Sequence, residues 1–282
     1  GSSWDDQSPL PDGWIELPLG RRHIEEMAIL MEAEFGSSTL LVLKDPRICR
    51  LVPFWEEVLR SLSIDFSFAL PVRNPLEVAQ SLEAAQGVPL KKGLLLWLSH
   101  FLQAERDTRP YKRSFLSYEQ LLTDWKKTAE QLEEDLGVQL PRATQRGAAE
   151  VDAFLQSGLR NQIISTEELN GRPDISDWIK DTYRWALQAT RNEPIPKTEI
   201  DHVFASLEKA RTAFMPSSSE ENSEDHDTSL GNSGPNKPTD LKPTELHENS
   251  PTEKDSGSAL SLYNAARDEQ TKDLIDCIKL LL

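Results

Sequence analysis

Three cations that follow predicted β-strands are the residues of this sequence best placed to do chemistry. An unbroken apolar run, Leu40–Leu43, leads into Lys44-Asp45-Pro46-Arg47, and a second apolar segment that ends at Val72 leads into Arg73. Ligands of open parallel sheets bind beyond the carboxyl ends of the strands. The pattern therefore predicts a site for an anionic ligand. The competing interpretation for each cation is an ordinary ion pair with a surface carboxylate.

The segment after Val72 carries the more detailed signal. Asn74 is a favourable N-cap and Pro75 a favourable first helical residue, so a helix is expected to begin here with a partial positive charge at its N-terminus. Ser81 lies seven residues after Asn74, or about two helical turns, and so shares its face. The Arg73 guanidinium and the Ser81 hydroxyl can then bracket one anionic group. Alternatively, Ser81 is simply an exposed helical serine.

Three segments resemble motifs of sulfotransferases that use 3′-phosphoadenosine 5′-phosphosulfate (PAPS). Residues 73–81, Arg-Asn-Pro-Leu-Glu-Val-Ala-Gln-Ser, resemble the motif that binds the 3′-phosphate of the nucleotide. Residues 43–47, Leu-Lys-Asp-Pro-Arg, resemble a strand end of the tyrosylprotein and bacterial carbohydrate-type sulfotransferases. Residues 117–122, Ser-Tyr-Glu-Gln-Leu-Leu, resemble the family's Y-E-x-L-L segment. The three segments keep the family's order, and the resemblance covers residues 1–165.

This resemblance implies a nucleotide site built around the second strand end. Arg73 and Ser81 would bind the 3′-phosphate of PAPS, and Arg160, in Leu159-Arg160-Asn161, would approach the nucleotide. The family's Gly-rich phosphosulfate loop, a strand followed by Arg-Ser-Gly-Thr-Ser/Thr and a helix, does not occur in the sequence, and neither does G-x-x-x-x-G-K-[ST]. We therefore expect an incomplete domain whose first strands and loop precede Gly1.

The remaining candidates concern sulfuryl transfer itself. Lys44 is the candidate for neutralising charge on the sulfuryl oxygens or the leaving phosphate, with an ion pair to Asp45 or a helix acid as the alternative. Arg47 is the candidate for orienting an acidic acceptor or the nucleotide, unless it forms a plain salt bridge. Trp97 is the candidate for stacking on a sugar, unless it packs in the core. Sulfuryl transfer needs no bound metal, and no metal is expected.

The general base is left open by the sequence. His100 lies within an apolar helix, where a histidine with satisfied hydrogen bonds in the core is the preferred interpretation. His23 is expected to be exposed at a helix start, and Asp45 precedes a proline, where aspartate commonly caps a turn.

Strands alternate with helices along the first 215 residues, which predicts an α/β fold. The expected fold is a P-loop-like parallel sheet flanked by helices and incomplete at its N-terminus. The expected strands are 38–44, 65–72 and 113–118. The expected helices are 23–35, 54–62, 75–85, 90–107, one ending at Gly137, and three more near 145–157, 174–191 and 198–214.

Composition divides the chain after this domain, residues 1–215. Residues 216–257 are rich in Ser, Glu, Asn, Pro and Asp, which predicts a disordered acidic linker. Residues 258–282 regain an imperfect helical stripe that includes Leu274, Ile275, Ile278 and Leu281. They are expected to begin another domain or to pair with a partner helix.

Charge and cysteine content exclude several classes of protein. A net charge of −16, with 31 basic and 47 acidic residues, disfavours general nucleic-acid binding. No apolar run is long enough to predict a membrane span. Two distant cysteines, Cys49 and Cys277, provide neither a disulfide scaffold nor a four-cysteine zinc site and favour a reducing, cytoplasmic setting.

Two functions follow from these observations. The first is a PAPS-dependent sulfotransferase domain that acts on a hydroxyl of a carbohydrate or small-molecule acceptor. The second is a non-catalytic, degenerate sulfotransferase-like module that binds or tethers within a larger protein, and the missing loop and long linker favour it. An unrelated nucleotide-binding α/β enzyme has only fold-level support.

Overall fold

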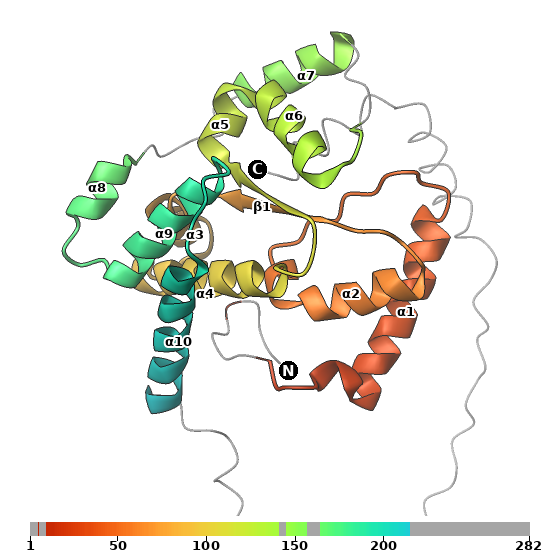
Figure 1. Ribbon diagram of the computed structural model, residues 1–282, viewed down its shortest axis with the longest axis horizontal. Coiled ribbons are helices and arrows are strands. Elements are labelled where there is room, and N and C mark those ends of the chain that lie inside the picture. Colours follow the sequence, from red (N-terminus) through yellow and green to blue (C-terminus); the bar gives the residue numbers. More distant parts are fainter. Residues whose placement is uncertain (1–4, 6–9, 141–144, 157–163, 215–282) are drawn as a thin grey trace, which may run out of the picture. The chain divides into compact units, whose positions relative to one another are not determined.

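The structure is a computed structural model that describes residue 5 and residues 10–140, 145–156 and 164–214 (Figure 1). Apart from Thr212–Phe214, the described residues belong to one compact unit. The predicted linker at 216–257, the predicted helix at 258–282 and Arg160 lie outside the described residues. In the part of the chain that is described, no helix has the length and apolar character needed to cross a membrane.

The described residues are mostly helical, with one small sheet. The two strands are β1 (Phe68–Val72) and β2 (Arg113–Ser117). The elements before β1 are η1 (Trp14–Glu16), α1 (Pro18–Phe35), η2 (Ile48–Arg50) and α2 (Val52–Ser61). Between the strands lie α3 (Pro75–Gln86) and α4 (Leu90–Asp107). After β2 come α5 (Tyr118–Thr123), α6 (Trp125–Leu136), α7 (Gln145–Gln156), α8 (Thr166–Gly171), α9 (Asp177–Ala189) and α10 (Lys197–Phe214).

The two strands run parallel, as the sequence predicts for strands that alternate with helices. Phe68 lies opposite Arg113 and Val72 lies opposite Ser117, so both strands end at the same edge. The connection between them consists of α3 and α4. A parallel pair needs such a long crossover, and here the crossover also covers one face of the sheet.

The predicted strand at Ser38–Lys44 is wrong. Leu40–Lys44 has no regular secondary structure, and no backbone hydrogen bond joins it to another residue within the described ranges. Leu41 and Leu43 instead pack beside α1 and α2 in a separate apolar cluster. The prediction took the apolar run as a sign of a buried strand, but Leu40 is exposed and Leu41, Val42 and Leu43 are only half-buried. A strand also needs a partner for its backbone N–H and C=O groups. The sequence also gave no signal for the short helix α8.

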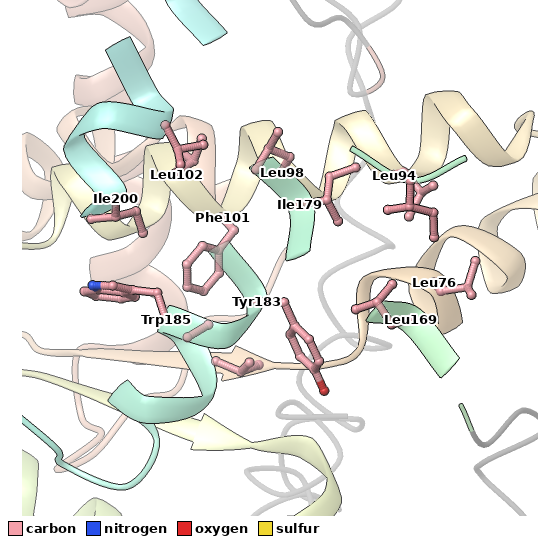
Figure 2. Packing of buried hydrophobic residues seen from close by; sticks show 14 of the residues in the cluster. Leu76, Leu94, Leu98, Phe101, Leu102, Leu169, Ile179, Tyr183, Trp185 and Ile200 are labelled. Atoms are coloured by element: carbon pink, nitrogen blue, oxygen red, sulfur yellow. The ribbon is translucent and has the colours of Figure 1, made fainter. Parts of the chain in front are cut away.

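The main apolar core lies on one face of the sheet, between the strands and α3, α4, α9 and α10. Figure 2 shows Phe101, Tyr183, Trp185 and Ile200 converging there. The Phe101 and Phe115 rings lie 6.3 Å apart, and Trp185 meets both rings edge-on. Aromatic residues bury the largest areas in a core, so this cluster fixes α4 and α9 against the sheet.

The opposite face of the sheet is covered unevenly. Leu116 of β2 packs on Leu132 and Leu136 of α6, and Figure 1 shows the strands between α6 and the layer that contains α4 and α9. The alternate residues of β1, Ala69 and Pro71, are exposed. Within the described ranges, the β1 side of this face is therefore the open side of the sheet.

Candidate functional site

The candidate site begins where the two strands end. Because Val72 and Ser117 are partners in the parallel register, the residues that follow them, Arg73 and Tyr118, are neighbours. The guanidinium carbon of Arg73 lies 4.6 Å from the centroid of the Tyr118 ring. A cation over an aromatic face is attracted by the ring quadrupole, so Tyr118 supports one side of the guanidinium.

A buried carboxylate holds Arg73 from a second direction. Arg73 Nε donates to Glu77 Oε2 at 3.1 Å, and the Glu77 side chain is 0% exposed. The spacing is i,i+4, which brings the two side chains together at the start of α3. The terminal nitrogens Nη1 and Nη2 of Arg73 have no hydrogen-bond partner among the described residues. They form the part of the guanidinium that can meet an anion.

Asn74 links the start of α3 to the segment before α8. Its Oδ1 accepts from the Leu76 N–H at 3.0 Å, which confirms the predicted N-cap. Its Nδ2 donates to the carbonyl oxygen of Ile164 at 3.0 Å, and the Ile164 N–H donates to Glu77 Oε1 at 3.0 Å. Asn74 and Glu77 thus bind both backbone groups of Ile164. We call this arrangement the Ile164 clamp.

The clamp forms part of a pocket of about 240 Å³ at the strand ends. Arg73, Tyr118, Ser165 and Thr166 line it, together with acidic Glu119 and other residues. This volume is below the roughly 300–1,000 Å³ of sites that enclose a whole small ligand. The pocket has room for one group of a ligand, such as a phosphate, and offers both a guanidinium and hydroxyls to it.

A larger hollow opens beside β1, with a volume of about 1680 Å³. We call it the strand-edge hollow. It shares Arg73 and Tyr118 with the smaller pocket, and it also reaches Lys44, Arg47 and Trp97. Four of the six site residues predicted from the sequence therefore lie along one hollow.

Arg47 is engaged by a neighbour. Its Nε and Nη2 donate to the two carboxylate oxygens of Asp45 at 2.7 and 2.6 Å. This bidentate pair, with further help from the Arg47 backbone N–H, lowers the pKa of Asp45 to about 2. The salt-bridge interpretation of Arg47 is therefore confirmed. Lys44 is exposed and forms no ion pair with any residue that the structure describes.

Trp97 takes part in the core while also lining the hollow. Its ring stacks on Phe101 with centroids 5.4 Å apart and an interplanar angle of 7°, and it meets Tyr183 edge-on at 6.2 Å. The core-packing interpretation of Trp97 is therefore confirmed. The ring is half-buried, so only part of it faces the hollow.

His100 and Cys49 also line the hollow, and burial disfavours the charged form of each. Burial, together with the positive charges of Arg50 and Arg211, lowers the pKa of His100 to about 4. Its Nε2 is buried without a hydrogen-bond partner among the described residues, so the predicted satisfied core histidine is wrong. Burial raises the pKa of Cys49 to about 12, and its thiol donates to the carbonyl oxygen of Pro46.

Ser81 lies elsewhere. It is exposed on α3, one turn beyond Glu77, and it lines neither of the two cavities. Arg160, as stated above, lies outside the described residues. Within the described ranges no three His, Cys, Asp or Glu side chains are grouped as a metal site would require.

Sequence reasoning named Arg73 but missed the residues that hold it. Glu77 could have been found from its i,i+4 spacing to Arg73, and Tyr118 from its place directly after a strand. Ile164 gave no sequence signal, because its role is carried by the backbone. Comparison of the chain with protein families, curated proteins and solved structures finds no match.

Proposed function

We propose that this chain is a PAPS-dependent sulfotransferase domain that acts on a hydroxyl of a carbohydrate or small-molecule acceptor. The observation that carries the proposal is the setting of Arg73 at the carboxyl end of β1. Glu77 and Tyr118 hold the guanidinium, while Nη1 and Nη2 have no partner among the described residues. Arginine in this state binds phosphate oxygens in bidentate fashion.

The proposed roles follow the two cavities. Arg73 binds the 3′-phosphate of the nucleotide in the strand-end pocket. Lys44, exposed on the strand-edge hollow, neutralises charge on the sulfuryl group or on the leaving phosphate. In the reaction the acceptor oxygen forms a bond to sulfur as the bond from sulfur to the 5′-phosphate oxygen breaks. The acceptor proton passes to a base, and adenosine 3′,5′-bisphosphate leaves.

The base is assigned to no residue. A pKa of about 4 makes His100 a weak proton acceptor near neutral pH. Asp45 is weaker still, because Arg47 lowers its pKa to about 2. Both residues are therefore left out of the proposed mechanism.

A binding-only module is the second candidate, and two observations favour it. The buried Glu77 carboxylate offsets part of the charge of Arg73, and exposed Ser81 lines neither cavity. Such a module would bind the nucleotide without transferring its sulfuryl group.

Thermal unfolding with adenosine 3′,5′-bisphosphate tests the proposal, with ADP as the control nucleotide. At about 100 times its Kd, a ligand adds roughly 2.7 kcal/mol to the free energy of unfolding. We expect a rise in Tm with the 3′-phosphorylated nucleotide only. The rise should be lost in Arg73→Ala and kept in Arg184→Ala, which removes an exposed ion pair with Asp181.

Incubation with ³⁵S-labelled PAPS and a panel of acceptors then separates the two candidates. Label on an acceptor supports the enzyme, whereas the Tm shift without transfer to any acceptor supports the binding module. The absence of any nucleotide-specific Tm shift in the unmodified chain would contradict both.

A further inference from the structure

The strand-edge hollow has apolar walls that are partly exposed to solvent. Phe35, Leu40 and Ile64 line it, and they are 40%, 37% and 41% exposed. Trp55, Leu62 and Phe66 line it as well and are only partly buried. Contiguous exposed apolar surface on a protein commonly marks a site of association. The hollow is therefore a candidate docking surface.

The size of the hollow favours a polypeptide as its occupant. Its volume of about 1680 Å³ exceeds the roughly 300–1,000 Å³ typical of small-molecule sites. A nucleotide at Arg73 would occupy one end of such a space. The apolar remainder, between α2, α6 and the open side of β1, is suited to side chains rather than to a polar cofactor.

The two outer edges of the sheet differ in how their backbone groups are covered. This difference also favours the β1 side as the docking surface. At the β2 edge, Gln131 Nε2 donates to the carbonyl oxygen of Phe115 at 3.2 Å, so a side chain covers that backbone. Along β1, Phe68 donates its N–H toward β2, and the alternation of a strand directs the backbone groups of Ala69 away from β2. Ala69 and Pro71 are exposed and line the hollow. Among the described residues, the β1 side of the sheet is thus the side that no other element covers.

One segment of the chain outside the described residues matches this surface. Leu274, Ile278 and Leu281 follow the i, i+4, i+7 spacing of anchors with which amphipathic helices bind apolar grooves. About 60 residues separate Leu274 from Phe214, where α10 ends. A flexible chain of that length has a root-mean-square span of about 40–45 Å, comparable to the diameter of a domain of 200 residues.

We propose that the segment Leu274–Leu282 docks in the strand-edge hollow of its own chain, with Leu274, Ile278 and Leu281 against the apolar walls. The connecting residues keep the segment at an effective concentration on the order of millimolar for its own domain. Docking within one chain is therefore favoured over binding to a second copy at ordinary protein concentrations. The proposal does not depend on the nucleotide or on sulfuryl transfer.

Cysteine cross-linking in the full chain tests the proposal, because Cys277 lies inside the segment. In a Cys49→Ser background, Ala69→Cys adds one thiol on the open edge of β1. The matched control is Ala205→Cys, on an exposed position of α10. Position 205 is much nearer to Cys277 along the chain, so random encounters favour the control.

We expect a short bismaleimide to join Cys277 to the β1 position at least ten times faster than to the α10 position. The product should be a monomer whose yield does not change with protein concentration, and Ile278→Asp with Leu281→Asp should abolish the difference. Equal rates for the two positions would overturn the proposal, and so would cross-linked dimers. Leu40→Cys, on the other wall of the hollow, replaces Ala69→Cys if circular dichroism shows that the latter does not fold.

Discussion

At the scale of single residues, the candidate site shows how a cation can be held without being fully neutralised. Glu77 accepts a hydrogen bond from Nε of Arg73, and the guanidinium lies over the ring of Tyr118. The strand-end arginine was predictable, because a cation after a predicted strand has a known place in a parallel sheet. Its two supports were not singled out, since each depends on the geometry of a neighbouring element.

Glu77→Gln tests whether Glu77 positions Arg73. The amide oxygen can still accept from Ile164 N–H, but the amide nitrogen cannot accept from Arg73 Nε. We expect affinity for adenosine 3′,5′-bisphosphate to fall about tenfold, corresponding to the roughly 1.4 kcal/mol of one charge-assisted hydrogen bond. Isothermal titration calorimetry measures the change. A variant that binds as tightly as the unmodified chain would show that Arg73 needs no such support.

His100 predicts a pH dependence of stability. Its pKa is about 4 in the folded state and near 6.5 when unfolded. Below pH 6.5 the unfolded chain therefore binds a proton that the folded chain does not, and stability falls as the pH drops toward 4. At pH 5 the uptake of this proton by the unfolded chain lowers the free energy of unfolding by about 2 kcal/mol relative to neutral pH.

Urea unfolding at pH 7.5 and pH 5 checks this expectation. Between the two pH values, the free energy of unfolding should fall by about 2 kcal/mol less in His100→Leu than in the unmodified chain. Exposed His202 provides the matched control, and His202→Leu should behave like the unmodified chain. If all three proteins lose equal stability, His100 does not have a lowered pKa.

At the scale of elements, the sequence predicted most helices and both strands that form. The helix at 90–107 matches α4 in its bounds, because a long apolar segment buried on most sides has few alternatives. The predicted strand at 38–44 is wrong because the apolar run is not buried as expected and has no hydrogen-bonding partner for its backbone among the described residues. The P-loop-like identity of the sheet remains part of the proposal, since two strands do not establish it.

The Ile164 clamp predicts that the Asn74 side chain stabilises both the start of α3 and the segment before α8. Asn74→Ala removes the N-cap of α3, worth about 1 kcal/mol. It also leaves the Ile164 carbonyl oxygen without its donor, which costs a further 1–3 kcal/mol or so in a buried site. We expect a loss of about 2–4 kcal/mol in the free energy of unfolding.

Ser176→Ala is the matched control for this experiment. The Ser176 side chain caps α9 by accepting from the Trp178 N–H and forms no second hydrogen bond with a described residue. Its loss should cost about 1 kcal/mol. Chemical denaturation compares the two variants, and equal losses would mean that the bond from Asn74 to Ile164 contributes nothing to stability.

At the scale of the whole described unit, buried charge ties together elements that are distant in the chain. Glu105 of α4 is 1% exposed and pairs with Arg109 and with Arg113 of β2. Arg109 also reaches Asp201 of α10 at 2.6 Å. These carboxylates raise the pKa of Arg109. One carboxylate thus connects α4, β2 and, through Arg109, α10.

Glu105→Gln should be strongly destabilising. It leaves two arginines without the charge that offsets their burial, and breaking one partner of a buried pair costs about 3–5 kcal/mol. Arg184→Ala, which breaks an exposed pair, should cost less than about 1 kcal/mol. Thermal unfolding followed by circular dichroism gives both values. A loss below 1 kcal/mol in Glu105→Gln would show that solvent reaches the arginines and replaces the carboxylate.

The parallel pairing of β1 and β2 also bears on the order in which the chain folds. Partners such as Phe68 and Arg113 are separated by α3 and α4, so they meet only after a long loop has closed. Loop closure slows folding, whereas the contacts between α3 and α4 are local in sequence. We therefore expect the α3–α4 pair to form early, and the sheet to join only after these two helices have brought its strands within reach.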